Sequence, residues 1–104
     1  MKRPRTGLSD RAVADILEQA DWYDVQSGSE LAKRWENAIT STVLRIVENP
    51  RAGALCNFTA EELHDVRRVP VAGFPRHLVF YQFQGNQILI LRVIHGARDL
   101  ESLF

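Results

Sequence analysis

Residues 77–95 read HLVFYQFQGNQILILRVIH, and this stretch decides the fold. Two runs rich in β-branched and aromatic residues, 77–83 and 87–95, flank the pair Gly85–Asn86. Such runs around a two-residue loop are typical of two strands joined by a tight turn. Glycine in the first loop position predicts a type II′ turn. The stretch is therefore predicted to form an antiparallel β-hairpin.

The turn sets which residues face each other across the hairpin. Counting back from the turn predicts the pairs Gln84–Gln87, Phe83–Ile88, Tyr81–Ile90, Val79–Arg92, His77–Ile94 and Arg76–His95. Both faces of the two strands are apolar, so we expect central strands that are covered on both sides. A helix pair is the expected cover on one side, and a segment from outside the chain is one candidate for the other.

Two helices are predicted upstream of the hairpin. Apolar residues recur at helical spacing over 12–23 and again over 31–46, with Gly28 between the two series. Ser9 is placed to cap the first helix, and Pro50 cannot continue the second. The short connection predicts an αα-hairpin.

A further strand is predicted between the helices and the hairpin. Residues 65–71 alternate with a period of two, and Pro70 confines this strand to a sheet edge or makes its end irregular. Residues 51–62 are predicted to form a loop, with one turn around 59–63. The chain is thus predicted to be an α+β domain.

Length and composition exclude several classes of protein. The chain has 104 residues, which suits a single domain spanning 1–104, and 45% of them are apolar, which is too many for a disordered chain. Its apolar runs are shorter than the roughly 20 residues that cross a bilayer, so we expect neither a membrane protein nor a secreted precursor. The single cysteine, Cys56, is expected to be a partly buried apolar residue of a cytoplasmic protein.

The formal net charge is zero, but the charges are segregated along the sequence. Residues 10–24 contain five acids and one base, whereas residues 66–98 contain five arginines, two histidines and no acid. Lys2 and Lys33 are the only lysines, which excludes a broad lysine-rich surface for nucleic acid. We therefore expect an acidic first helix and an arginine-rich sheet.

The basic end of the sheet is the candidate site. Arg92 interrupts an apolar strand, so it either pairs with an acid of the first helix or the tail, or it faces a ligand. His77 and His95 are candidate general bases, but hydrogen-bonding strand-end histidines are favoured because no carboxylate is near them in sequence. The histidines and the cysteine lack metal-ligand spacing, and no phosphate-binding loop or nucleophile elbow is present, so no metal or cofactor is expected.

The segments 74–81 (FPRHLVFY) and 91–100 (LRVIHGARDL) resemble the ParE branch of the RelE/ParE superfamily, the toxins of bacterial type II toxin–antitoxin pairs. The pattern NPxxG at 49–53 and the Arg67–Arg68 strand extend the likeness over essentially the whole chain. The resemblance implies a β-α-α-β-β-β order, with a short first strand within 3–8. The C-terminal residues 99–104 are expected to form a short turn or helix that packs on the body or contacts a partner.

Two activities divide this superfamily. RelE-like members cleave messenger RNA on the ribosome with a cluster of Lys and Arg and a Tyr or His, whereas ParE-like members inhibit DNA gyrase without known catalysis of their own. Arg98 matches an arginine of the nuclease tail, but Phe104 stands where the catalytic tyrosine is expected, and no lysine lies on the sheet. The resemblance therefore favours a gyrase inhibitor over an enzyme. A messenger RNA endonuclease and a non-toxic binding domain are the alternatives.

The residues expected to contact the target are Arg76, Arg92, His95 and Arg98. In a nuclease, the catalytic residues would be His77, His95, Arg76 and Arg98. The resemblance also implies a cognate antitoxin as partner, operator DNA bound only through that antitoxin, and a cytoplasmic protein that arrests growth and stabilises plasmids. It implies no cofactor, no metal and no membrane.

Overall fold

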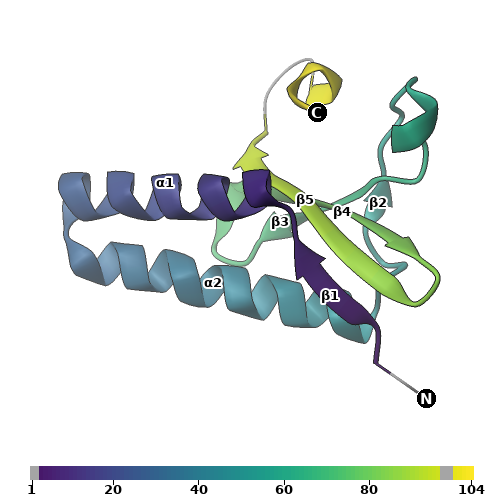
Figure 1. The fold of residues 1–104 in the computed structure, drawn as a ribbon. Coiled ribbons are helices and arrows are strands. Elements are labelled where there is room, and N and C mark those ends of the chain that lie inside the picture. The colour runs from purple at the N-terminus through teal and green to yellow at the C-terminus, as the bar shows by residue number, and fades with distance from the viewer. Residues whose placement is uncertain (1–2, 97–99) are drawn as a thin grey trace.

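The computed structural model describes residues 3–96 and 100–104 and shows a helical hairpin packed on one face of a twisted sheet (Figure 1). The elements are β1 (Arg5–Leu8), α1 (Asp10–Ser27), α2 (Ser29–Glu48), β2 (Ala54–Leu55), the 3-10 helix η1 (Glu61–Leu63), β3 (Arg67–Val71), β4 (Phe74–Gln84), β5 (Gln87–His95) and the 3-10 helix η2 (Leu100–Leu103). The α+β class, the short first strand and the two-helix order are confirmed. The two-residue strand β2 lies within the segment predicted to be a loop.

The helix boundaries follow the predicted signals. The Ser9 side chain accepts a hydrogen bond from the Ala12 backbone N–H at 3.0 Å, so Ser9 is the N-cap of α1. Gly28 separates the helices with φ at +93°, a conformation that glycine adopts without strain. The second helix ends at Glu48, two residues before Pro50.

The five strands form one sheet in the order β1-β5-β4-β3-β2. β1 runs parallel to β5, and the other pairs are antiparallel. β2 pairs only with Arg67 and Arg68, so Pro70 lies beyond the part of β3 that β2 covers. The register of β3 shifts between Pro70 and Val71, which confirms the predicted irregular end.

The β4–β5 hairpin keeps the predicted register near its turn and loses it halfway along. Gly85 and Asn86 both have positive φ, +55° and +60°, so the turn is type I′ and the predicted type II′ is wrong. A bulge places Leu91 between two paired positions and shifts the register by one residue. The predicted pairs Val79–Arg92, His77–Ile94 and Arg76–His95 are wrong, and the structure has Phe80–Arg92, Val79–Val93, Leu78–Ile94 and His77–His95.

The sheet separates two apolar clusters. The larger one lies between the sheet and the helices and contains Trp35 and Tyr81, both fully buried. The second lies on the opposite face around Phe80, where residues 56–66 and the C-terminal segment cover the sheet. The second cover therefore comes from the chain itself. Cys56 belongs to this cluster and is 3% exposed, which confirms its role as a buried small residue.

The C-terminal segment is fixed to the body at two points. The Glu101 carboxylate accepts hydrogen bonds from the backbone N–H groups of Thr59 and Ala60 at 2.9 and 2.8 Å, and these bonds lower the pKa of that carboxyl group. The Phe104 ring lies 5.4 Å from the rings of both Phe58 and Phe80. The expected short C-terminal helix thus packs on the body. No helix of the described residues is long and apolar enough to cross a membrane.

Candidate functional site

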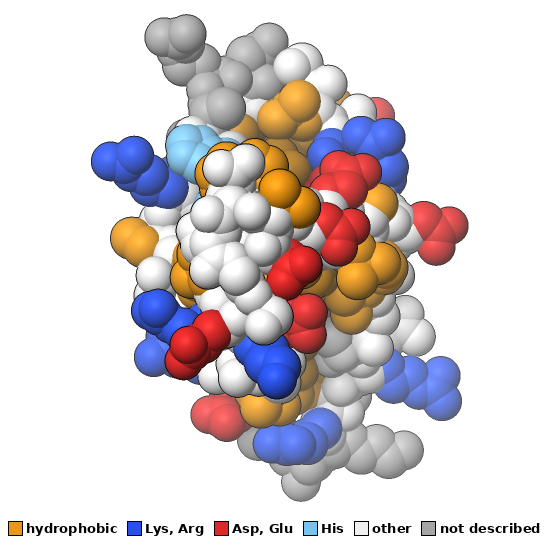
Figure 2. Space-filling view, turned by 90° about the vertical axis from the view of Figure 1, so that its left-hand side faces the viewer, with side chains coloured by type: hydrophobic (Ala, Val, Ile, Leu, Met, Phe, Trp, Pro, Cys, Tyr) orange, Lys and Arg blue, Asp and Glu red, His pale blue; other side chains and the backbone are white. Residues whose placement is uncertain are grey.

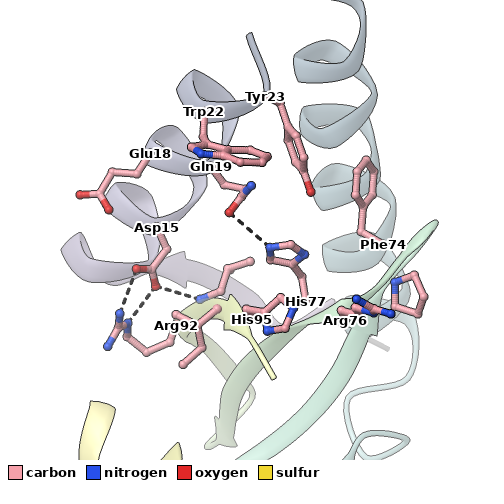
Figure 3. A pocket seen from close by; sticks show the side chains of 13 residues that line it. Asp15, Glu18, Gln19, Trp22, Tyr23, Phe74, Arg76, His77, Arg92 and His95 are labelled. Carbon is pink, nitrogen blue, oxygen red and sulfur yellow. Dashed lines mark hydrogen bonds and ion pairs between the residues drawn. The ribbon is translucent and has the colours of Figure 1, made fainter. Parts of the chain in front are cut away.

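A cavity of about 830 Å³ opens between α1 and the adjoining ends of β4 and β5 (Figure 3). Ligand sites in proteins commonly occupy clefts of this size. The helix supplies Asp15, Glu18, Gln19, Trp22 and Tyr23, and the sheet supplies Phe74, Pro75, Arg76, His77, Arg92, Val93, Ile94 and His95. Three of the four predicted target-binding residues therefore line one cavity. The fourth, Arg98, lies outside the described residues.

Arg92 is held by α1 and by the C-terminal segment. Its Nε lies 2.8 Å from Oδ2 of Asp15, its Nη2 lies 3.0 Å from Oδ1, and its Nη1 donates to the Leu103 carbonyl. The hydrogen bond to Asp15 raises the pKa of the arginine, although burial opposes this shift. Arg92 is only 8% exposed. Pairing with an acid of the first helix, one of the two predicted alternatives, is the one observed.

His77 lies at the inner end of the cavity. Its ring is 4.9 Å from the Trp35 ring and 5.4 Å from the His95 ring, and its Nε2 is 3.3 Å from Oε1 of Gln19. Burial lowers the pKa of His77, and the charge on His95 lowers it further. The hydrogen-bonding role predicted for a strand-end histidine is therefore observed for His77.

Arg76 and His95 lie at the outer end. They are not cross-strand partners, because the bulge in β5 places His77 opposite His95. The Arg76 carbonyl instead accepts a hydrogen bond from the Gly96 N–H at 2.7 Å. Both side chains are exposed, and the Arg76 guanidinium has no hydrogen bond or ion pair with any residue in the described ranges. Arg76 is thus a cation available to a ligand.

The aromatic wall of the cavity was not predicted. Tyr23 makes tilted or edge contacts with Trp35 and Phe74 at ring distances of 5.8 and 5.6 Å. Trp22 is 57% exposed and contacts Tyr23 at 5.6 Å. Sequence reasoning missed Trp22 because its position falls on the outward face of α1. A large aromatic residue on a polar helix face was the available signal, since such residues are enriched at binding surfaces.

The acidic and basic segments of the sequence lie next to each other in the structure, because residues of both line the cavity. Asp15 and Glu18 of α1 line the same cavity as Arg76, His77 and His95, and Asp15 lies next to Arg92 (Figure 3). From the end where the helices meet, acidic side chains are interspersed with exposed apolar ones (Figure 2). The large exposed apolar residues of α1 are Val13, Leu17, Trp22 and Val25. The acidic helix therefore forms one wall of the basic site.

The cavity combines anion-binding side chains with aromatic surface. A guanidinium and two imidazoles are suited to a phosphate or carboxylate, and an imidazole that stays neutral near pH 7 can accept a proton. Phe104 packs on the opposite face of the sheet, against Phe80. Among residues 3–96 and 100–104, no three His, Cys, Asp or Glu side chains are grouped to hold a metal ion.

Solved structures with the same fold come from bacterial toxin–antitoxin systems. A chain of the chromosomal ParDE system from P. aeruginosa matches with a TM-score of 0.74 and 21% identity, covering 91% of this chain and 98% of that one. A chain of the intact E. coli RelBE toxin–antitoxin complex matches with a TM-score of 0.58 and 13% identity, covering 91% and 99%. The isolated E. coli RelE toxin matches with a TM-score of 0.56 and 14% identity, covering 96% and 93%.

The family comparison goes further than the fold. No curated protein matches the sequence. A family model described as the ParE toxin of the type II toxin–antitoxin system parDE matches residues 7–100. That match spans both α-helices, the strands β2 to β5, the second half of β1 and the residues that line the cavity. The chain therefore belongs to the ParE toxin family of type II toxin–antitoxin systems.

Proposed function

We propose that this ParE-type toxin inhibits DNA gyrase and is neutralised by a cognate antitoxin. The observation that carries the choice of target is the chemistry at the basic end of the sheet. Its cations are arginine and histidine, and both lysines of the chain are far from it in sequence. We infer that these side chains bind an anionic surface of the target rather than carry out the proton transfers of RNA cleavage.

The position of Phe104 supports the same choice. Cleavage of RNA by the 2′-hydroxyl needs a base and an acid on opposite sides of the phosphate. Phe104 has no exchangeable proton, and its ring packs against Phe58 and Phe80 rather than lining the cavity. We infer that this residue contributes to packing and that the chain acts without catalysis of its own.

Messenger RNA cleavage is the second candidate, and one observation favours it. His77 and His95 lie side by side with ring centroids 5.4 Å apart, and both line the cavity with Arg76. Two adjacent imidazoles are able to serve as a base and an acid. In this alternative the catalytic residues are His77, His95, Arg76 and Arg98.

The antitoxin partner is supported by the relatives, because solved structures with this fold come from ParDE and RelBE toxin–antitoxin systems. We infer that the antitoxin binds this chain in the cytoplasm and that operator DNA is bound through the antitoxin alone. Loss of the antitoxin would then arrest growth, which is how such a pair would stabilise a plasmid.

Induced expression in a bacterium tests whether the chain is toxic. We expect growth arrest when the chain is expressed alone and normal growth when the adjacent upstream gene is expressed with it. A non-toxic binding domain would allow normal growth in both cases. A supercoiling assay beside a translation assay then separates gyrase from messenger RNA as the target.

A further inference from the structure

We propose that the cavity between α1 and the ends of β4 and β5 binds a purine nucleoside monophosphate unit. The base would lie against Trp22, and the phosphate would be held by Arg76, His77 and His95. This ligand goes beyond the proposed function, because inhibition of a protein target does not require it. The unit could be a free nucleotide or part of a single strand of nucleic acid, and both sources share the same chemistry.

The aromatic wall provides the place for the base. The Trp22 side chain is 57% exposed and lies at the rim of the cavity, above Gln19 (Figure 3). Tyr23 and Phe74 continue this wall toward the sheet and are fixed by ring contact with each other at 5.6 Å. Bases stack on exposed aromatic side chains independently of sequence, and purines offer the larger face. An exposed indole beside a fixed aromatic wall is therefore suited to a purine.

The sheet wall provides the donors for the phosphate. The Arg76 guanidinium is exposed and has no partner among the residues that the structure describes. His77 uses Nε2 toward Gln19, and His95 uses Nδ1 toward the Gly96 carbonyl. The other nitrogen of each ring has no hydrogen-bond partner within the described part of the chain. The bonded nitrogen of each ring faces an oxygen and so carries the proton of the neutral imidazole, and the free nitrogen becomes a second donor when the ring takes up a proton beside an anion. The Arg76 guanidinium and the two imidazoles thus line one cavity with nitrogens that can bind a phosphate.

The charge balance favours an anion over a cationic side chain. Asp15 lines the cavity, but both of its carboxylate oxygens are bonded to Arg92, and one also accepts the Val93 N–H at 3.0 Å. Glu18 is then the one acid of the lining outside an ion pair among the described residues. Its negative charge and the positive charge of Arg76 balance while the two histidines are neutral, and uptake of a proton by either imidazole beside an anion makes the cavity positive. A cavity of about 830 Å³ also exceeds what a single lysine or arginine side chain would fill.

Isothermal titration calorimetry of the purified chain tests this proposal. The probes are AMP, CMP, adenosine, inorganic phosphate, arginine amide and a single-stranded adenine oligonucleotide. We expect AMP to bind at least about tenfold more tightly than either adenosine or phosphate alone, because both parts of the ligand are held. We expect CMP to bind more weakly than AMP because its base stacks less surface.

Two variants with matched controls locate the site. Trp22→Ala and Arg76→Gln should each weaken AMP binding by about tenfold. Leu44→Ala and Arg34→Gln remove an exposed apolar residue and an exposed arginine from α2, away from the cavity, and should leave binding unchanged. Thermal unfolding of each variant shows whether the fold is retained.

The outcomes distinguish the ligands. Much tighter binding of the oligonucleotide than of AMP, with the same dependence on Trp22 and Arg76, assigns the site to a nucleic acid strand, and equal or weaker binding assigns it to a free nucleotide. The proposal is overturned if AMP fails to bind at about 10 mM, if phosphate binds as well as AMP, or if arginine amide is the preferred probe. Equal loss of binding in the control variants would also overturn it.

Discussion

Asp15 and Arg92 are 77 positions apart in the sequence and form the ion pair that joins α1 to β5, with an Nε–Oδ2 distance of 2.8 Å. The same carboxylate oxygen accepts the backbone N–H of Val93 at 3.0 Å, so Asp15 binds both the side chain and the backbone of the strand. Arg92 also donates to the Leu103 carbonyl. A single residue pair thus positions α1, β5 and the C-terminal segment around the candidate site.

Removing one partner of this pair should destabilise the protein. In Asp15→Ala, the Arg92 guanidinium stays buried without its carboxylate, so we expect the free energy of unfolding to fall by about 3 kcal/mol. Chemical denaturation measures this change. Asp21→Ala removes an exposed acid of the same helix and should cost less than about 0.5 kcal/mol.

The double variant Asp15→Leu with Arg92→Met provides a stricter test. Both charges are replaced by apolar side chains of similar size, so most of the lost stability should return. A double variant as unstable as Asp15→Ala would show that the cost comes from something other than the unpaired charge.

His77 should make the stability depend on pH. Its pKa in the folded protein lies below the ordinary value of 6.5 because of burial and the charge on His95. The unfolded chain therefore binds a proton more readily, and the free energy of unfolding should fall as the pH drops from about 7.5 to about 5.5. Above this range the imidazole is neutral in both states and contributes no slope.

Denaturation of His77→Gln across the same pH range isolates this contribution. The variant should show a weaker fall in stability toward acid than the wild type, whereas His64→Gln, which replaces an exposed histidine outside the cavity, should follow the wild type. Parallel curves for wild type and His77→Gln would contradict the assignment.

The C-terminal segment should protect the only cysteine from reaction. Cys56 is 3% exposed and belongs to the cluster that Phe104 contacts through Phe58 and Phe80. Burial also raises the pKa of its thiol, which slows alkylation. Phe104→Ala and Glu101→Ala should each release the segment and increase the alkylation rate several-fold.

Glu48→Ala, an exposed acid at the end of α2, is the matched control and should alkylate at the wild-type rate. Mass spectrometry of the alkylated protein reports the rate without ambiguity, because the chain has one cysteine. Unchanged rates in both tail variants would show that the segment does not shield this cluster.

The arginines of the candidate site should be needed for toxicity. Arg76→Ala removes an exposed guanidinium from the cavity lining, and Arg98→Ala removes the arginine that follows β5 in the sequence. We expect each variant to increase the number of surviving cells by roughly tenfold on induction without loss of the fold, because charged anchors dominate such contacts. Arg34→Ala should remain fully toxic, and full toxicity of Arg98→Ala would remove that residue from the site.

The parts of the fold that sequence reasoning predicted are those with local causes. Ser9, Gly28 and Pro50 each act on neighbouring residues, so the helix boundaries followed from them. The bulge at Leu91 has no local signal, because Leu91 lies in a continuous apolar run that would fit either register. The predicted register therefore paired His95 with Arg76, whereas the structure pairs it with His77.

The candidate site was predicted only in part, because its basic side chains could be placed from the strand pattern and its helical wall could not. The basic side chains lie near the start of one strand of the hairpin and near the end of the other, and these ends adjoin in any antiparallel hairpin, so their gathering at one end could be predicted. The wall formed by α1 depends on how the helix packs across the sheet, which places Asp15 beside Arg92 and Tyr23 beside Phe74. Such contacts between distant segments follow from the tertiary structure and have no spacing of their own.

The proposed target of this ParE-type toxin is gyrase. Purified gyrase, relaxed plasmid and ATP are incubated with increasing amounts of the purified chain, while a ribosomal translation reaction receives the same amounts and its messenger is examined for cuts. We predict that supercoiling is blocked, that cleaved gyrase–DNA complexes accumulate, and that the messenger stays intact, with Arg76→Ala weaker than Arg34→Ala in the gyrase reaction. Normal supercoiling together with cut messenger would contradict the account.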